Sequence, residues 1–409
     1  MARLRPAWIA LLFIATLAGA EEITLVTYNL LNFPGSTGAA RAPYFRTVMD
    51  GLGPDLIVAQ EILGQTGVNY FEQNVLDVWE PGSWSVGPYH DGYDTDNALF
   101  YRTGMIEVLG SGWLDTALRD IDWWHLRWAA TGDEFRVYSL HLKASQGVDN
   151  EAKRLAECEI LRTSLDALPA GLPFLVVGDF NIYTAAESAY QHLTGPGAGE
   201  LFDPIDQEGN WHDTAIYAPI HTQSTRTTSF GGGATGGMDD RFDLILAGED
   251  LLDGGGLEID PATYLAYGND GNHFNLSIVT GVNTAVPADV ANALHEASDH
   301  LPVRATLLSD VSTSVASAVP AERLRIVAAP NPFNPATTIR FSLPGAGAGA
   351  LVVYDLRGRE VRRLLSGIPA GAPDEAVWDG RGREVPSGVY FARVSSGGAA
   401  ESVRLVLVR

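Results

Sequence analysis

Residues 174–181 read Phe-Leu-Val-Val-Gly-Asp-Phe-Asn: four apolar residues, then a glycine, a carboxylate, an aromatic ring and an amide. The apolar run after Pro173 predicts a strand that is buried on both faces. A carboxylate and an amide at the end of such a strand cannot join the core unless they are paired or bind a metal ion. The stretch therefore predicts a buried strand that delivers Asp179 and Asn181 to a polar site.

The same arrangement recurs at three other places in the chain. Residues 27–30 read Thr-Tyr-Asn-Leu, residues 59–61 read Ala-Gln-Glu, and residues 298–300 read Ser-Asp-His. Each string lies beside an apolar segment of strand length. Four such junctions predict one polar site where several strands end, which makes the chain an enzyme candidate.

Strand and helix patterns alternate through the first 300 residues. We expect strands over 23–28, 56–59, 97–101, 106–109, 135–142, 174–179, 241–247 and 301–308, and helices over 44–52 and 151–168. Gly- and Asp-rich loops separate these segments. The pattern predicts an α/β domain over residues 21–308.

The composition changes after this domain. Residues 309–322 are small and polar and have no periodicity, which predicts a linker. Residues 323–409 contain short strand patterns punctuated by Pro and Gly, and no helix pattern. They predict a small all-β sandwich.

The first twenty residues have the organisation of a secretory signal peptide. Arg3 and Arg5 are followed by an apolar stretch over 8–17 and by the small residues Ala18-Gly19-Ala20. The stretch is too short to span a bilayer, although an uncleaved anchor is the alternative. We expect a secreted or cell-surface protein with no stable membrane insertion. The only cysteine, Cys158, excludes an intrachain disulfide.

Charge is distributed unevenly between the two predicted domains. Residues 21–310 contain 13 Lys and Arg against 42 Asp and Glu, a net charge of −29, whereas residues 311–409 carry +4. A strongly acidic domain attracts divalent cations and lacks the clustered Lys and Arg of non-specific nucleic-acid binding. Solubility alone is the alternative explanation of the acidity.

Oxygen-bearing side chains dominate the strand ends. They are Glu61, Asp179, Asp243 and Asp299 among the acids, and Asn29 and Asn181 among the amides. Such ligands suit Mg²⁺, Mn²⁺ or Ca²⁺, and no Cys/His set for zinc is present. His141 and His300 can exchange protons near neutral pH. A single strand-end Asp is more often a turn or helix cap, but the combination indicates phosphoester hydrolysis.

In order and spacing, these motifs resemble the endonuclease/exonuclease/phosphatase superfamily over residues 22–308. The matching strings are Tyr28-Asn29, Gln60-Glu61, His141-Leu142, Gly178 to Asn181, Arg241-Phe242-Asp243 and Ser298 to His300. The resemblance implies a four-layer sandwich of two packed mixed β-sheets flanked by helices. The histidine at position 141 resembles the deoxyribonuclease and sphingomyelinase branches of the superfamily. Abasic-site enzymes tend to have tyrosine at this position, which argues against an abasic-site function.

The resemblance also implies which function each site residue has. The implied metal ligands, for Mg²⁺ or alternatively Mn²⁺ or Ca²⁺, are Asn29, Glu61 and Asp299. The implied catalytic residues are His141, Asp179, Asn181, Asp243 and His300. Asp179 would orient or deprotonate the attacking water, and His300, steered by Asp243, would contact the phosphate. Asn97, Arg102 and Lys143 are candidate phosphate contacts, against the commoner case of exposed strand-end charges.

Four tryptophans lie in the middle of the domain. They are Trp113, Trp123, Trp124 and Trp128. Base stacking or contact with a lipid surface would suit them. We favour packing in the core and at the sheet rim.

The tail resembles the C-terminal sorting domains of the type IX secretion pathway and the related flagellar-hook-cap immunoglobulin-like module. The strings that carry this resemblance are Pro330 to Pro335, Val353-Tyr354-Asp355, Gly358-Arg359, Trp378-Asp379-Gly380 and Pro386 to Phe391. It implies export or surface attachment, with the export machinery as partner. A plain structural β-module is the alternative.

Together these features predict an exported, divalent-metal-dependent phosphoesterase that acts as a monomer, and we favour a phosphodiesterase that acts on nucleic acid. A phospholipase C-like or phosphomonoester hydrolase is the second hypothesis. A surface-anchored binding protein with an inactive site is the third, and the complete set of site residues argues against it.

Overall fold

The computed structural model describes residues 21–309, 325–329, 331, 333–342, 349–355, 358–368, 375–380, 385–396 and 399–408. The predicted signal peptide, and the predicted linker after Ser309, lie outside these residues. The chain forms two compact units that divide between Val311 and Ser312, and each is described by itself. None of the described helices has both the length and the hydropathy that a membrane crossing requires.

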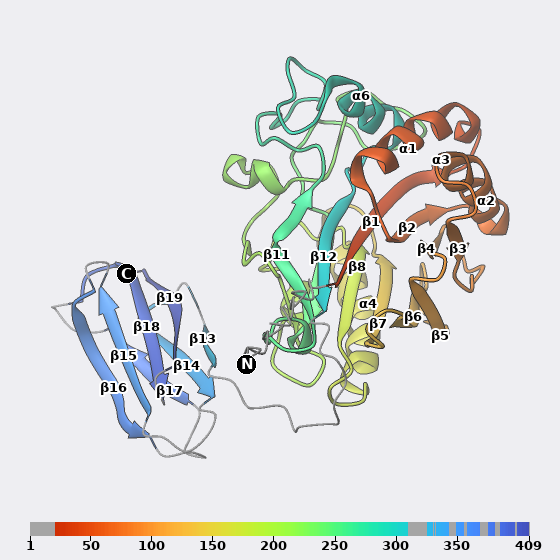
Figure 1. Ribbon diagram of the computed structural model, residues 1–409. Coiled ribbons are helices and arrows are strands. Elements are labelled where there is room, and N and C mark those ends of the chain that lie inside the picture. The colour runs from red at the N-terminus through yellow and green to blue at the C-terminus, as the bar shows by residue number, and fades with distance from the viewer. Residues whose placement is uncertain are drawn as a thin grey trace, which may run out of the picture. The chain divides into compact units, whose positions relative to one another are not determined.

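The first unit is built on two six-stranded sheets (Figure 1). The first sheet has the order β11 (Leu257–Ala266), β12 (Val303–Ser309), β1 (Glu21–Phe33), β2 (Leu56–Ile62), β4 (Asp96–Arg102), β3 (Trp84–Val86). The second has the order β5 (Ile106–Leu114), β6 (Ile121–Trp128), β7 (Glu134–His141), β8 (Phe174–Asp179), β10 (Asp243–Gly248), β9 (Leu201–Phe202). Both sheets are mixed, because β1 runs parallel to β2 and β7 parallel to β8 among otherwise antiparallel pairs.

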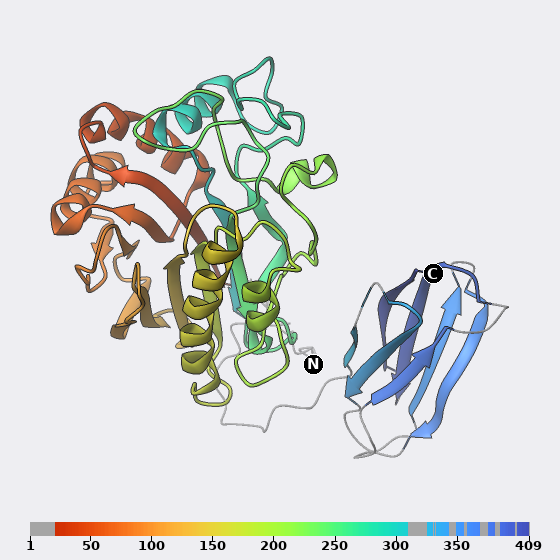
Figure 2. The same ribbon diagram turned by 180° about the vertical axis from the view of Figure 1, so that it is seen from behind.

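Helices cover the outer face of each sheet and complete four layers. The first sheet carries α1 (Gly38–Leu52), α2 (Gly64–Phe71), α3 (Asp77–Trp79) and α6 (Ala288–Ala297), and the second carries α4 (Val148–Asp166) and α5 (Ser188–Leu193). Figure 2 shows α4 lying along the second sheet. Apolar side chains fill three separate cores, one between the sheets and one under each helical layer. The predicted four-layer fold is confirmed.

Strand alternation explains why a polar site forms between the sheets. In β1, Ile23 and Leu25 face the core between the sheets, so Thr27 and Asn29 continue the same inward-facing row. The corresponding row ends are His141 in β7, Asp179 in β8 and Asp243 in β10. Asp179 pairs in register with both His141 and Asp243. Polar side chains thus gather where the apolar core between the sheets ends.

A chain of buried polar side chains joins the two sheets beneath this site. Thr27 Oγ1 donates to Gln60 Oε1 at 3.2 Å, and Gln60 Nε2 donates to Ser139 Oγ at 3.0 Å. Ser139 Oγ donates to Asn97 Oδ1 at 2.9 Å, and Asn97 Nδ2 donates to Asp122 Oδ2 at 2.8 Å. Each of these five side chains therefore has a hydrogen-bond partner, as a low-dielectric interior favours.

Asp122, the last side chain of this hydrogen-bonded series, predicts that the stability of the fold depends on pH. Burial raises the pKa of Asp122 to about 8, although the Asn97 amide partly opposes the shift. The folded protein therefore holds this proton more tightly than the unfolded chain. The stability from Asp122 is fully present below about pH 4 and is lost as the pH rises towards 8. In Asp122→Asn an uncharged amide keeps the acceptor oxygen. The variant should therefore not show the decrease in the free energy of unfolding that Asp122 causes as the pH rises, which is on the order of a few kcal/mol.

Urea unfolding of wild type and Asp122→Asn at several pH values between 4 and 8.5 would measure this. The free energy of unfolding of the variant should increase relative to that of the wild type as the pH rises. The difference between the two proteins cancels the titration of other groups. Parallel curves for the two proteins would show that Asp122 is not held protonated.

The second unit is a small all-β region, as predicted. One sheet has the order β13 (Arg325–Ala329), β14 (Ala336–Ser342), β17 (Glu375–Asp379), and the other β16 (Glu360–Ile368), β15 (Gly349–Asp355), β18 (Gly388–Ser396), β19 (Ala399–Leu407). The side chains of Phe333, Ile339, Trp378 and Leu405 belong to one buried core drawn from both sheets. The resemblance to sorting domains remains an expectation.

Candidate active site

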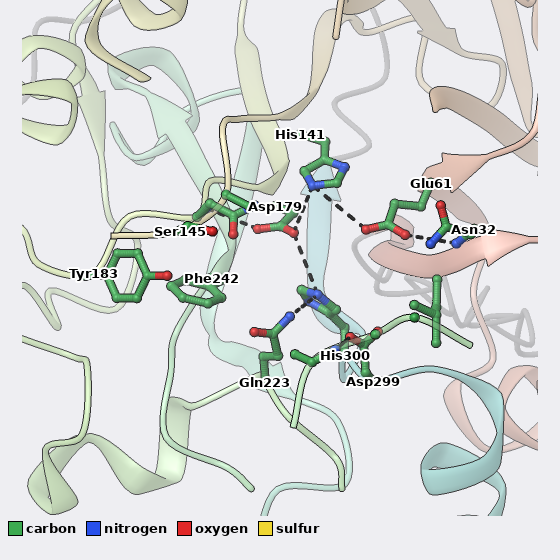
Figure 3. Close-up of a pocket in the computed structure, with 16 residues that line it drawn as sticks. Asn32, Glu61, His141, Ser145, Asp179, Tyr183, Gln223, Phe242, Asp299 and His300 are labelled. Carbon is green, nitrogen blue, oxygen red and sulfur yellow. Dashed lines mark hydrogen bonds and ion pairs between the residues drawn. The ribbon is translucent and has the colours of Figure 1, made fainter. Parts of the chain in front are cut away.

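A cavity of about 370 Å³ opens where the inward-facing rows end. Six of the residues that the sequence assigns to the site line it: Glu61, His141, Asp179, Asn181, Asp299 and His300 (Figure 3). The other two, Asn29 and Asp243, are fully buried behind the lining, and each is hydrogen-bonded to a residue that lines it. The structure therefore brings all eight together.

Three of these side chains form a group that could hold a metal ion. The ligand atoms of Glu61, His141 and Asp179 lie within 4.8 Å of one another. His141 Nε2 lies 3.5 Å from Asp179 Oδ2 and 3.8 Å from Glu61 Oε1. Two carboxylates at such a short separation repel each other unless a cation lies between them. The donor set thus fits a hard divalent cation.

Asn29 acts on these carboxylates through its amide nitrogen. Its Nδ2 donates to Glu61 Oε1 at 3.0 Å and to Asp179 Oδ2 at 3.1 Å, while its Oδ1 accepts from Leu31 N. The amide oxygen is therefore engaged away from the two carboxylates. In this arrangement Asn29 positions both acids, and its assignment as a metal ligand remains a prediction.

Asp299 also lines the cavity, close enough to Glu61 to influence the pKa of that carboxyl group. Burial, followed by the charge of Asp299, raises the pKa of Glu61. Asp299 Oδ2 accepts a hydrogen bond from Ala234 N at 2.6 Å. Glu61 and Asp299 thus form an acidic pair that a divalent cation would stabilise, in agreement with their predicted function as ligands.

His300 and Asp243 form a buried dyad. His300 Nδ1 lies 2.7 Å from Asp243 Oδ2, and His300 Nε2 lies 3.7 Å from Asp179 Oδ2. Burial alone would lower the pKa of His300, but the charges of Asp243 and Asp179 raise it well above its ordinary value. The two carboxylates therefore favour the protonated form of His300, which suits it to donate a proton.

His141 has the opposite tendency. Burial, assisted by the positive charge of Arg119, lowers its pKa well below the ordinary value. Burial raises the pKa of Asp179 to about 7, and Asp243 adds to the shift. Asp179 thus lies between one imidazole whose pKa is lowered and one whose pKa is raised. Groups whose pKa values are driven apart in this way suit acid and base steps at neutral pH.

Strained backbone is concentrated around the cavity. Leu31, Asn32, Glu61 and Asn181 have φ angles of 49°, 49°, 58° and 50°. Non-glycine residues avoid this left-handed region, and the cost of about 1–3 kcal/mol each is borne mainly at functional sites. The turn at Glu61 brings its Oε2 within 2.9 Å of Asn32 N. No local sequence pattern signals these angles.

Sequence reasoning missed two features of the cavity. Gln223 lines it with its side-chain amide 2.5 Å from His300 Nε2, where the amide oxygen would accept from a protonated imidazole, and the loop 232–234 forms a wall over Asp299. Gly233 lies so close to Asp299 that an added Cβ would meet its Oδ2 at 2.6 Å. The run of glycines over 231–237 was the available signal, since it permits such a close approach.

The three candidate phosphate contacts do not enter the cavity lining. The prediction that Arg102 contacts phosphate is wrong. Arg102 pairs with Asp55 at 2.7 Å and with Glu80 at 2.5 Å, at the opposite end of β2 and β4 from Glu61. Asn97 is committed to the buried polar chain. Lys143 Nζ donates to the carbonyl of Ala144, which itself lines the cavity.

A second group of ligand-type atoms lies outside the cavity lining. Those of His212, Asp239 and Asp240 also lie within 4.8 Å of one another. His212 Nδ1 lies 2.7 Å from Asp240 Oδ1, which already gives that carboxylate a partner. Glu61, His141 and Asp179 are therefore the group positioned to serve a reaction in the cavity.

Comparison with known proteins identifies a family. The sequence model of the Endonuclease/Exonuclease/phosphatase family matches residues 26–300. No curated protein sequence matches the chain.

Several solved structures are similar over about 70% of the chain. An endonuclease/exonuclease/phosphatase family protein from Bacteroides thetaiotaomicron is 18% identical (TM-score 0.47) and covers 71% of this chain and 99% of its own. D. rerio TDP2, complexed with single strand DNA product, is 13% identical (TM-score 0.48; 70% and 98%). A mannosyl-6-phosphatase from Bacteroides thetaiotaomicron is 20% identical (TM-score 0.48; 70% and 99%).

Proposed function

Because the chain belongs to the endonuclease/exonuclease/phosphatase family and is therefore a metal-dependent phosphoesterase, we propose that it hydrolyses phosphodiester bonds of nucleic acid. The proposal extends the family assignment to a substrate class. It is supported by the residues of the cavity and by the directions in which burial and neighbouring charges shift their pKa values.

The arrangement around Asp179 carries the proposal. Its Oδ2 lies 3.5 Å from His141 Nε2 and 3.7 Å from His300 Nε2, so one carboxylate can orient a water molecule between two imidazoles. A divalent cation held by Glu61 and Asp299 would neutralise phosphoryl oxygens. His300, kept protonated by Asp243, donates to the scissile phosphate. His141 faces the same phosphate from the other wall as a neutral donor, and Asn181 helps to hold the water.

Phosphomonoester hydrolysis is the second candidate. The cavity lining among the described residues contains neither Lys nor Arg, and residues 21–310 carry a net charge of −29. A polyanion gains little from such a surface, whereas a small substrate with one phosphate needs only the metal ion and the two histidines. A phospholipase C-like activity would share this chemistry.

A substrate panel separates these candidates. The purified protein would be tested with Mg²⁺, Mn²⁺ or Ca²⁺ on plasmid DNA, single-stranded DNA, RNA, p-nitrophenyl phosphate, bis-p-nitrophenyl phosphate and phosphatidylcholine vesicles. We expect diester cleavage that EDTA abolishes and added metal ion restores. Cleavage of the monoester alone, or of the vesicles alone, would overturn the proposal in favour of the second candidate.

We also propose that the protein is exported and that residues 323–409 direct its sorting to the cell surface. The signal-like composition of residues 1–20 and the tail motifs support this. Cell fractionation of the native host, with the full chain and with a chain that ends at Ser309, provides the test. An unchanged surface fraction for the shortened chain would contradict the sorting function.

A further inference from the structure

We propose that the stacked side chains of Trp113 and His90 form a base-binding subsite, which holds one unpaired nucleobase of the substrate beside the scissile phosphate. The inference rests on the proposed phosphodiesterase function and narrows it to single-stranded or dinucleotide substrates. Trp113 is also the one of the four central tryptophans that differs most from the packing expected of them. Trp124 and Trp128 are buried in the core between the sheets, whereas Trp113 is 49% exposed.

The stack is flat and is held at both rings. The ring centroids of His90 and Trp113 lie 3.9 Å apart, with an angle of 5° between the planes. Trp113 Nε1 donates to Asp115 Oδ1 at 3.1 Å, and His90 Nε2 lies 3.0 Å from Asp120 Oδ2. His90 therefore covers part of the indole surface, and about half of the side chain stays available to a ligand. A pre-oriented aromatic ring of this kind is a platform for stacking a base.

Strand register places the platform on the same face as the active site. Trp113 pairs with Asp122 across β5 and β6, and Asp122 pairs with Ser139 across β6 and β7. Directly paired residues share a face, and so do residues two apart, which adds His141 to this row. Two strand spacings and two residues along β7 separate the Cα atoms of Trp113 and His141 by roughly 12 Å. Trp113 thus lies on the inward-facing side of the sheet, two strands away from His141, which lines the cavity.

Arg119 fixes the platform to the catalytic strand. Its guanidinium donates to the carbonyl oxygens of His141 and Leu142, each at 2.9 Å. Its neighbour in sequence, Asp120, holds His90. The subsite and the active-site histidine therefore keep a constant separation, which a subsite needs if it is to position a phosphate.

The charges around the stack select a neutral ligand group. Asp115 and Asp120 contact the two rings, and Asp94 pairs with Arg119 at 3.2 Å. These carboxylates repel a second phosphate, so the platform suits an uncharged base. A base within a duplex is already stacked on its neighbours and must be extruded at a cost. The subsite consequently favours single-stranded ends and dinucleotides.

Steady-state kinetics on matched substrates tests the subsite. The substrates are a dinucleoside monophosphate, its analogue lacking one base, and a hexose 6-phosphate. For the dinucleotide, Trp113→Ala should raise KM by roughly 5- to 100-fold with kcat little changed, because stacking is uniform binding. The abasic analogue should show no such change, and Trp113→Phe should restore most of the affinity. Tyr93→Ala, which removes an exposed ring (77%) outside the stack, is the matched control.

The other outcomes are decisive in different ways. Equal effects of Trp113→Ala on the intact and abasic dinucleotides would overturn the subsite and leave the phosphodiesterase function standing. Hydrolysis of the hexose phosphate with a KM that depends on Trp113, and without dinucleotide hydrolysis, would show a sugar platform and overturn the inference. Failure of wild type on every diester, including the abasic one, would refute the proposed function itself and the subsite with it.

Discussion

Replacing Glu61 by glutamine should lower kcat by about a thousandfold or more while the protein stays folded. The substitution removes one negative charge from the group of Glu61, His141 and Asp179 at nearly constant volume. Charge stabilisation centred on a metal ion contributes several kcal/mol to such reactions, and each 1.36 kcal/mol is a factor of ten in rate. Glutamine retains one oxygen that can accept from Asn32 N, which glutamate does at 2.9 Å.

Kinetics at increasing Mg²⁺ concentration, together with the melting temperature, measures this effect. The variant should need more Mg²⁺ for whatever activity remains, and its melting temperature should stay close to that of wild type. Glu107→Gln is the control, because Glu107 is an exposed residue of β5 that pairs with Arg127 and does not line the cavity. Turnover within tenfold of wild type at every Mg²⁺ concentration would remove Glu61 from the site.

Substitution of the His300–Asp243 dyad should produce the second large effect. His300→Ala should lower kcat by roughly 10²–10⁴, the range expected of a positioned proton-transfer group. Asp243→Asn should be somewhat milder, and the double variant should be no worse than His300→Ala, since Asp243 acts through His300. His295→Ala, on α6 outside the cavity lining, should leave kcat unchanged.

The pH profile distinguishes a proton-transfer function from a merely structural one. The charge of Asp243 raises the pKa of His300, so Asp243→Asn should lower that pKa. His300 would then lose its proton at lower pH, and the alkaline limb of kcat/KM should move to lower pH. A variant with reduced activity and an unmoved alkaline limb would show that the dyad only supports the fold.

The amino-acid sequence was sufficient to locate most of the candidate site. Asp179 follows four apolar residues, and His300 precedes another buried strand, so each signal is contained in a few neighbouring residues. A buried apolar strand that ends in an ionisable group is costly in isolation, and this local cost is what makes the pattern informative. The alternating strands and helices predicted the α/β class for the same reason, because side-chain periodicity is a local property.

Features that depend on strand direction were decided only by the tertiary structure. Arg102 ends an apolar strand as Asp179 does, yet β4 runs antiparallel to β2 and carries Arg102 to the end remote from Glu61. Gln223 comes from a loop with no apolar neighbour to mark it, and its place beside His300 follows from long-range pairing. Glu61 turns into the cavity through a left-handed backbone angle that its neighbours in sequence do not require.

Sheet position likewise sorted residues of the same type. Trp124 lies in β6, which has a strand on either side, and is buried between the sheets, whereas Trp113 lies in β5 at the edge of the sheet and stays exposed. Sequence reasoning treated the four tryptophans as one group outside the expected strands and could not separate them, because burial depends on which strands become neighbours. Local composition determined the kinds of side chain at each strand end. Only the packing of two sheets, whose contacts join residues far apart in the chain, decided which of those ends meet.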